Sequence, residues 1–387
     1  MASSSLPPPG IQRGYSRDLE CLRGIAILLV FLYHVHFFVP THRATAVSPL
    51  AAFVHAGHTG VTLFFVLSAF LLSRPFLAEA SGAPPTSIAR FWKRRALRIL
   101  PLYATAVVLA TLWNGQHPGN WGMALRYLLF LNSRQRGVEA LSPFSEVWWS
   151  LATEAQFYLL LPIGVLLARR RRGRWLLLAL GAAYGLAYAA YAARPARMEA
   201  LGDLSLRLSV FGRGPAFLAG IAAAWLYGAH GARLRAGLGR MRWMRVGGSD
   251  LVLVALVLGQ GLLLARVASL GFFRAEVAWL AWHVYEATLW AAALLVLLVA
   301  PLRLRPLVVN RGLEWIGLLS YSMYLWHFAV LSGVIRWGPR LPSIGAGWTG
   351  DITAVALAGL AGCVAISALT YRAIERPFLV RKDRVAR

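Results

Sequence analysis

Residues 17–34 read RDLECLRGIAILLVFLYH, a charged approach that leads into an unbroken apolar run. Within this stretch, Arg23 and His34 lie eleven residues apart. On an α-helix, eleven residues give a net rotation of roughly 20° and a rise of about 16 Å, so both side chains share one face. That rise is roughly half the thickness of the hydrocarbon core of a bilayer, which places a cation near the membrane surface and an imidazole near the midplane.

An ionisable group at mid-membrane depth is costly and usually faces a cavity or the interior of a helix bundle. The stretch therefore predicts that the rest of the chain packs around His34. The alternative is a histidine that is satisfied by one hydrogen bond between packed helices. This stretch alone leaves both interpretations open.

The composition indicates a membrane protein, since 58% of the 387 residues are hydrophobic and only 14% are charged. Soluble domains contain fewer apolar residues and about a quarter charged ones. The net charge of +25 does not indicate nucleic-acid binding, because the basic residues fall between apolar runs, as in cytoplasmic loops. Two cysteines, Cys21 and Cys363, predict neither a disulfide framework nor a metal site.

The apolar runs predict an all-α, polytopic membrane bundle of about ten spans, with no appended soluble domain. The expected spans are 22–39, 60–77, about 98–113, 146–168, 175–193, 206–227, 251–268, 277–300, 315–335 and 352–371. The segment 121–131 is apolar but too short to cross, and is interpreted as interfacial or re-entrant. We expect a disordered tail at 1–16, a transmembrane domain at 17–378 and a basic cytoplasmic tail at 379–387.

The distribution of Lys and Arg predicts that both termini are cytoplasmic. With the N-terminus inside, 28 of the 40 Lys and Arg residues fall on the inner side and 10 on the outer side. This asymmetry follows the positive-inside rule and needs an even number of spans. The first apolar run has no evident cleavage site and is interpreted as a retained span.

Several polar residues of the predicted spans are candidates for chemistry. Arg95 and Arg98 share a helical face and could hold phosphates, or only anchor the helix in the membrane. Glu154 is expected at a depth close to that of His34, as a partner of the imidazole or as a link between two helices. Arg213 lies at Gly212–Pro215, a predicted helix break, where it could hold an anionic or carbonyl group or satisfy freed carbonyls.

The ninth span carries a second group of polar residues, Ser322, Tyr324 and His327. The two hydroxyls could bind a polar substrate, and His327 is a second imidazole candidate. It is expected nearer the outer surface, and therefore ranks below His34.

Taken together, these stretches resemble the membrane-bound acyltransferase type 3 family. The resemblance rests on Arg23 with ten residues before His34, and on FFVLSAFL (64–71), RALRILP (95–101), WSLATEAQFY (149–158), SYSMYLWH (320–327) and IERPF (374–378), in that order. It covers residues 17–378. Two departures are Ala69, where glycine is usual, and Ala155, where a second glutamate is common.

The resemblance implies an O-acyltransferase of a bacterial cytoplasmic membrane that moves an acetyl or other short acyl group from acyl-coenzyme A to a hydroxyl. Family acceptors include polysaccharide and lipopolysaccharide sugars, peptidoglycan and macrolides. The resemblance implies that His34 is catalytic and that Arg23, Arg95 and Arg98 bind the donor. From its expected depth, we add Glu154 to the predicted catalytic residues. Acyl-coenzyme A is then a co-substrate, with no metal and no permanently bound cofactor.

A multi-pass transporter is the alternative function, because buried His, Glu and Arg also suit a proton or substrate pathway. Transporters of many folds show interrupted helices in two repeated halves. Only one such interruption is evident, at Gly212–Pro215, and this favours the enzyme. The sequence leaves open whether His34 acts as a base or carries the acyl group, and it leaves open the acceptor, the acyl chain and the oligomeric state.

Overall fold

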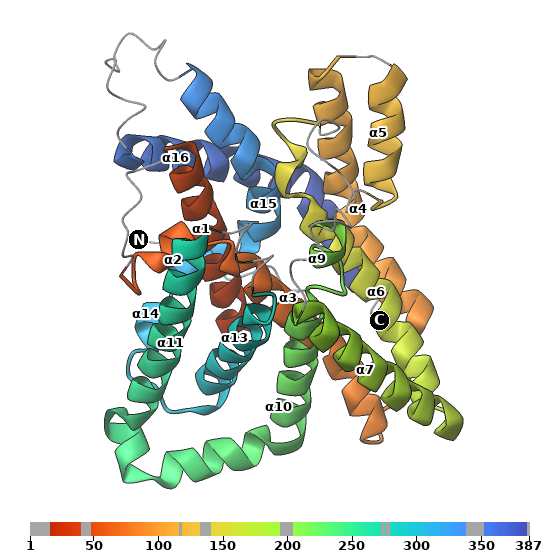
Figure 1. Cartoon of the computed structure of the whole chain (residues 1–387), viewed down its shortest axis with the longest axis vertical. Helices are drawn as coiled ribbons and strands as arrows, with labels where there is room; N and C mark the ends of the chain where they lie inside the picture. The colour runs from red at the N-terminus through yellow and green to blue at the C-terminus, as the bar shows by residue number, and fades with distance from the viewer. Residues whose placement is uncertain are drawn as a thin grey trace.

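The computed structural model describes residues 16–39, 48–115, 118–131, 141–193, 204–271, 275, 279–337 and 352–384. These residues form helices and no strands, so the protein is an all-α bundle (Figure 1). Apart from Ser16, the expected N-terminal tail lies outside the described residues. The elements in order are α1 (Arg17–Phe38), α2 (Ala52–His55), α3 (Thr59–Ala80), α4 (Ile88–Trp113), α5 (Pro118–Leu128), η2 (Ser145–Val147), α6 (Trp149–Ala168), α7 (Arg171–Ala192), α9 (Leu204–Arg207), α10 (Gly214–Arg240), η3 (Met244–Gly248), α11 (Ser249–Leu270), α13 (Trp282–Val299), α14 (Arg305–Val308), α15 (Arg311–Trp337), α16 (Ile352–Thr370), η6 (Tyr371–Glu375) and α17 (Arg376–Arg384).

Nine helices within this described part are long and apolar enough to cross a membrane, where about ten were expected. The difference is the expected span 206–227, which corresponds to α9 and α10. Glycines and a histidine interrupt the apolar run of α10, which keeps this helix of 27 residues out of the nine. The predicted break is its start, since α10 begins at Gly214 with Pro215 in its first turn, where a missing N–H costs nothing.

One end of the bundle brings together segments that were all expected on the cytoplasmic side. Residues of α1, the end of α3, the start of α4, the C-terminal half of α10, and η6 and α17 line the same pocket. The beginning and the end of the described chain therefore lie at one face of the bundle. This arrangement agrees with an even number of crossings.

The core of the bundle is the contact between α1 and α15, which two glycines make possible. A Cβ at Gly24 would lie 2.3 Å from the carbonyl oxygen of Leu313, and one at Gly317 would lie 1.9 Å from that of Glu20. Small residues let membrane helices approach until their backbones touch. The two helices are thus held in one register, which fixes the side chains farther along them.

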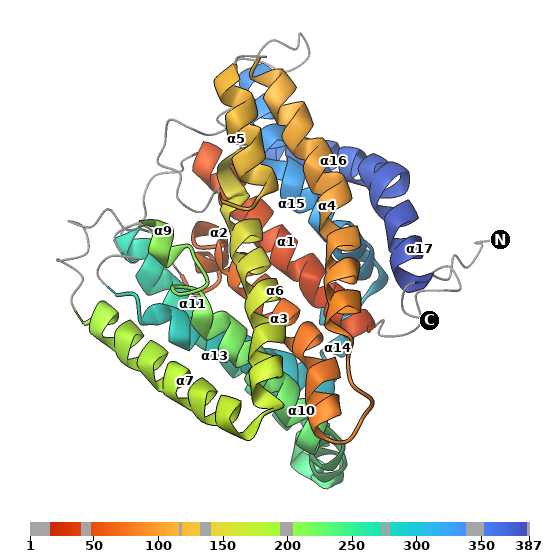
Figure 2. The same ribbon diagram turned by 90° about the vertical axis from the view of Figure 1, so that its right-hand side faces the viewer.

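The remaining helices surround this pair at different depths. Figure 2 shows α1 in the middle of the bundle, with α7 at one edge and α16 and α17 at the opposite edge. Only Gly173 and Tyr188 of α7 are buried, so nearly all of its apolar surface is available to lipid. The expected interfacial segment 121–131 is largely the short helix α5, which pairs with α4.

Candidate active site

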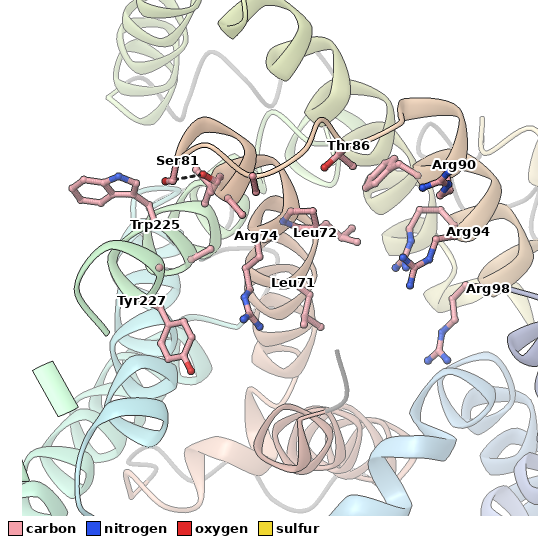
Figure 3. A pocket seen from close by; sticks show the side chains of 18 of the residues that line it. Leu71, Leu72, Arg74, Ser81, Thr86, Arg90, Arg94, Arg98, Trp225 and Tyr227 are labelled. Carbon is pink, nitrogen blue, oxygen red and sulfur yellow. Dashed lines mark hydrogen bonds between the residues drawn. The ribbon is translucent and has the colours of Figure 1, made fainter. Parts of the chain in front are cut away.

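A large basic pocket lies at the end of the bundle to which α1, η6 and α17 contribute residues (Figure 3). Its volume is about 1210 Å³. Seven guanidinium groups line it, and Glu20 is the single carboxylate among its lining residues. The arginines are Arg23, Arg74, Arg90, Arg94, Arg95, Arg98 and Arg235. Such an excess of one charge creates a strong positive potential and favours an anionic ligand.

Four of these arginines, Arg90, Arg94, Arg95 and Arg98, form the α4 arginine row. They recur at spacings of three and four residues, which places them on neighbouring positions of one helix face. The helix starts one turn earlier, where the hydroxyl of Ser87 accepts a hydrogen bond from the backbone N–H of Arg90. Like charges at this spacing repel one another, so the row is stabilised when an anion lies between its members.

Two members of the row have buried donors without a partner in the protein. The Nε atoms of Arg94 and Arg95 are shielded from solvent, and neither makes a hydrogen bond to the described residues. A buried donor of this kind costs free energy until an acceptor arrives. Phosphate oxygens are suitable acceptors, because guanidinium groups bind them in a bidentate way.

Arg23 connects the pocket to the central helix pair. It extends from α1, donates a hydrogen bond to the hydroxyl of Ser320 on α15 at 3.3 Å, and lies 3.8 Å from the carboxylate of Glu20. The three donor-binding residues predicted from the sequence, Arg23, Arg95 and Arg98, therefore line one pocket.

The rim of the pocket is held by an ion pair between two helices. Arg169, just beyond α6, donates to both carboxylate oxygens of Glu79 at 2.7 and 3.0 Å, and to the carbonyl of Thr86 at 3.3 Å. The backbone N–H of Thr86 in turn donates to Glu79 at 2.9 Å. This network orders the loop between α3 and α4 at the point where it borders the pocket.

His34 pairs with a second imidazole, His327 of α15. Nδ1 of His34 lies 3.3 Å from Nε2 of His327, and the ring centroids are 4.9 Å apart. The expectation that His327 lies nearer the outer surface than His34 is therefore wrong. The two residues occupy the same depth because the glycine contact fixes the register of α1 and α15. Both belong to one candidate site, about 16 Å along α1 from Arg23.

The hydrogen bonds of the two rings define which nitrogen is available for chemistry. Nδ1 of His34 lies 2.8 Å from the carbonyl oxygen of Val30, and Nδ1 of His327 lies 2.9 Å from that of Tyr324. A carbonyl oxygen only accepts, so both Nδ1 atoms carry the proton. Nε2 of His327 can then accept from Nδ1 of His34. Nε2 of His34 is left with its lone pair, as a base or a nucleophile requires.

Glu154 contacts Ser68 of α3, and no described contact joins it to His34. Its carboxylate accepts a hydrogen bond from the hydroxyl of Ser68, and it interacts electrostatically with Arg23 and Arg95. The described contacts include none between Glu154 and His34, so the expected pairing of these two residues is wrong. Similar depth, inferred from counting along two separate helices, does not establish that two side chains face each other.

The hydroxyls expected to bind a substrate already have partners in the protein. Ser322 is fully buried and donates to Glu375, which also interacts electrostatically with Arg98. The hydroxyl of Tyr324 donates to the carbonyl of Val147 at 2.5 Å and lies 2.6 Å from that of Ser150. Both side chains connect α15 to its neighbours.

Arg213 forms a second buried polar cluster, away from the basic pocket. Nη1 of Arg213 lies 2.6 Å from Nε2 of His283, and Nδ1 of His283 lies 3.2 Å from the carboxylate of Glu286. Thr62 donates to the same carboxylate at 2.9 Å. The guanidinium carbon of Arg213 also lies 5.4 Å from the ring centroid of Trp149. The cluster joins α3, α6, α10 and α13.

The sequence interpretation missed part of the pocket. Arg74 ends an apolar run and Arg235 lies in a basic linker, so both appeared to be inner-side markers only. No periodicity connects residues on α3 and α10. For Arg90 and Arg94, the helical spacing to Arg98 was a usable signal.

Comparison with known proteins identifies a family and several relatives. A family model described as an acyltransferase domain, of type 3, matches residues 16–372. Acyltransferase MdmB of Streptomyces mycarofaciens is 29% identical over 396 residues, which cover 96% of this chain and 92% of MdmB. BcsY of Komagataeibacter xylinus, to which membrane-bound transacylase activity is ascribed, is 27% identical over 81% of this chain and 72% of its own.

A shorter match links the chain to a cell-wall enzyme. The peptidoglycan O-acetyltransferase OatA of Listeria monocytogenes is 26% identical over 168 residues, which cover 39% of this chain and 24% of OatA. No solved structure matches the chain.

Proposed function

Since the chain belongs to the acyltransferase type 3 family, we propose that it transfers an acetyl or another short acyl group from acyl-coenzyme A to a hydroxyl group. The observation that carries this proposal is the pocket of about 1210 Å³, with seven guanidinium groups and one carboxylate. Coenzyme A presents a pyrophosphate and a 3′-phosphate, which match such a site in size and charge. The Nε atoms of Arg94 and Arg95 supply donors that such a ligand would satisfy.

The acceptor in this proposal is a hydroxyl of a cell-envelope glycan or glycolipid, or of a macrolide-type metabolite. The relation to a protein named as a peptidoglycan O-acetyltransferase supports transfer to oxygen. We place the enzyme in the bacterial cytoplasmic membrane with both chain ends on the cytoplasmic side. The basic residues that line the pocket would then face the compartment that contains acyl-coenzyme A.

His34 is the proposed general base. Nε2 of His34 accepts the proton of the acceptor hydroxyl while the hydroxyl oxygen attacks the thioester carbonyl. The carbon–sulfur bond breaks, and the coenzyme A thiolate takes the proton back from the imidazolium. As the imidazolium forms, Nδ1–H of His34 donates to Nε2 of His327, which helps to stabilise the positive charge.

An acyl-histidine intermediate is the second route that the same geometry allows. The lone pair on Nε2 of His34 would attack the thioester carbonyl, and the carbon–sulfur bond would break to release the coenzyme A thiolate. The acceptor hydroxyl would then attack the acyl group, the bond between the acyl carbon and Nε2 would break, and the hydroxyl proton would pass to the thiolate. In both routes Arg23, Arg95 and Arg98 hold the donor phosphates. Glu154, which accepts from Ser68, adds negative charge to the surroundings of Arg23 and Arg95. The transporter alternative loses its support with the family assignment.

The experiment uses the purified protein in lipid nanodiscs. Coenzyme A should bind in a calorimetric titration, and radiolabelled acetyl-coenzyme A should transfer its label to lipid-linked glycans or to a macrolide. An ester product is recognised because mild alkali releases the label. The proposal is wrong if the protein binds no coenzyme A, or if labelled compounds cross the membrane of sealed vesicles without any covalent change.

A further inference from the structure

The basic pocket has two sides that different helices supply. Figure 3 shows Arg90, Arg94 and Arg98 on one side and Arg74 with Trp225 and Tyr227 on the other, with Leu71 and Leu72 between them. Arg235, eight residues or about two helical turns beyond Tyr227 on α10, lines the same pocket. We name Arg74 and Arg235 the α3–α10 arginine pair. A ligand that fills the pocket meets two separate groups of cations.

Tyr227 holds the α3–α10 arginine pair in place. The guanidinium carbon of Arg74 lies 5.5 Å from the centroid of the Tyr227 ring, and that of Arg235 lies 5.4 Å from it. Arg235 also donates a hydrogen bond to the Tyr227 hydroxyl at 3.1 Å. Aromatic rings attract cations at such distances. Among the described residues, no carboxylate forms an ion pair with either arginine, so two positive charges converge on one ring without an anion between them.

An accessible aromatic surface lies beside this pair. Trp225 lines the pocket and is 53% exposed. Phe91, the aromatic residue that α4 contributes to the pocket lining, is 8% exposed and packs against Phe76 with ring centroids 5.4 Å apart. The Trp225 ring also makes a T-shaped contact with His230, with centroids 5.8 Å apart. A flat apolar ligand group therefore finds a more exposed ring on the α10 side of the pocket than on α4.

The position of the histidines sets the direction in which a donor must lie. The thioester has to reach His34, about 16 Å along α1 from Arg23. The phosphates next to the extended arm then meet Arg23 and the α4 arginine row. The nucleoside at the other end of the molecule is left for the opposite side of the pocket, where Trp225 and the α3–α10 arginine pair are located (Figure 3).

We propose that Arg74 and Arg235 bind the 3′-phosphate of the donor and that Trp225 stacks on its adenine ring. The site thus selects 3′-phosphorylated coenzyme A over nucleotides that carry only the pyrophosphate. This inference rests on the proposed function, because it assigns the far end of the same donor. A phosphate monoester suits two converging guanidinium groups, which can bind it through several charge-assisted hydrogen bonds.

The experiment compares two ligands that differ by one phosphate. Calorimetric titration of the nanodisc-embedded protein with coenzyme A and with 3′-dephospho-coenzyme A gives the preference for the 3′-phosphate. In the wild-type protein, we expect coenzyme A to bind about tenfold or more tightly than the dephospho form, which is the scale of a charge-assisted hydrogen bond. The double variant Arg74→Ala/Arg235→Ala should bind both ligands equally and as tightly as wild type binds the dephospho form. Trp225→Leu should weaken the binding of both ligands by the same factor.

The matched control is Arg233→Ala/Arg240→Ala, because both arginines are exposed on α10 and neither lines the pocket. This control should keep the full preference. If the double variant at Arg74 and Arg235 keeps it too, or if wild type binds both ligands equally, the inference is wrong and the donor proposal stands. If wild type binds neither ligand, both fail. Because Arg74 and Arg235 are exposed, their removal leaves the core packing intact.

Discussion

Two histidine sites in this bundle differ in what surrounds the imidazole. Nδ1 of each ring contacts a backbone carbonyl, and Nδ1 of His34 also lies 3.3 Å from Nε2 of His327. His283 is only 2% exposed and lies between the guanidinium of Arg213 and the carboxylate of Glu286. His34 is half-buried, and its Nε2 keeps a lone pair. The first site leaves a ring nitrogen with a lone pair, whereas in the second the three side chains contact one another.

The surroundings of His34 suit a chemical reaction, whereas those of His283 suit a structural role. Backbone carbonyls fix a tautomer without adding charge, so an imidazole held by them stays ready to accept a proton or an acyl group. In His283, both ring nitrogens already have partners, the cation on one side and the carboxylate on the other. The cluster joins four helices. Buried groups of this second kind are expensive to break once formed. The two sites should therefore respond in opposite ways to substitution.

The largest expected effect is at His34. His34→Gln keeps the size of the side chain and its hydrogen bonding but cannot take a proton or carry an acyl group. Transfer from acetyl-coenzyme A should fall by about 10² to 10⁴, the contribution of a general base. The melting temperature and the affinity for coenzyme A should not change. Near wild-type turnover by a well-folded His34→Gln protein would make this histidine structural.

The second effect concerns stability. Glu286→Ala removes the carboxylate that His283 and Thr62 contact, in a region where Glu286 is fully buried. Unfolding in detergent should become easier by about 3 kcal/mol, because a buried polar cluster loses one of its members. Thermal unfolding followed by circular dichroism measures this loss. Glu286→Gln, which still accepts from Thr62, is the control. A variant that melts like wild type but transfers no acyl group would instead place this cluster in catalysis.

The third prediction contrasts donor binding with the chemical step. Arg95→Ala and Arg98→Ala should each weaken coenzyme A binding about tenfold, and Lys should rescue only part of it because the bidentate fork is lost. With saturating donor, the turnover of these variants should approach that of the wild type. A fall in turnover that donor cannot restore would show that the row acts on the reacting groups, and the contrast with His34 would disappear.

The smallest expected effect is at His327. His327→Ala leaves His34 as the base but removes the group that accepts from its Nδ1. We expect turnover to fall by about 3- to 10-fold, the value of one hydrogen bond, with unchanged affinity for coenzyme A. Asn at this position could restore an acceptor and part of the rate. If His327→Ala equals His34→Gln in severity, the two imidazoles act as a single catalytic unit.

The sequence predicts which residues share a face of one helix. It does not predict which residues of different helices contact each other. Helical periodicity placed Arg23 and His34 on one face, and placed Arg95 beside Arg98, because these relations need only the geometry of one helix. The contact of His34 with His327 spans 293 positions and depends on where α1 and α15 touch. The glycines that decide this contact give no periodic signal.

The same limit explains the errors about Glu154 and the incomplete pocket. Depth was counted along each helix from the residue at which it was expected to enter the membrane. This count gives the depth of a residue but not the neighbouring helix that its side chain faces. Glu154 is turned toward Ser68, and this orientation follows from the packing of α6 on α3. Arg74 and Arg235 meet over Tyr227 only because α3 and α10 lie side by side. Compositional rules predicted only a side of the membrane for these two arginines and gave no indication that they line one pocket.

The contact between Gly24 and Gly317 has a consequence for the membrane as an electrical barrier. A membrane enzyme with polar side chains inside its helix bundle risks becoming a leak for protons and ions. Where two backbones touch without side chains between them, no chain of water molecules can pass. This contact lies next to Arg23, on the part of α1 between the basic pocket and the imidazole pair. A bulkier residue at Gly24 would separate the two helices. Ions could then leak through the gap and lower the membrane potential, and turnover would fall as well.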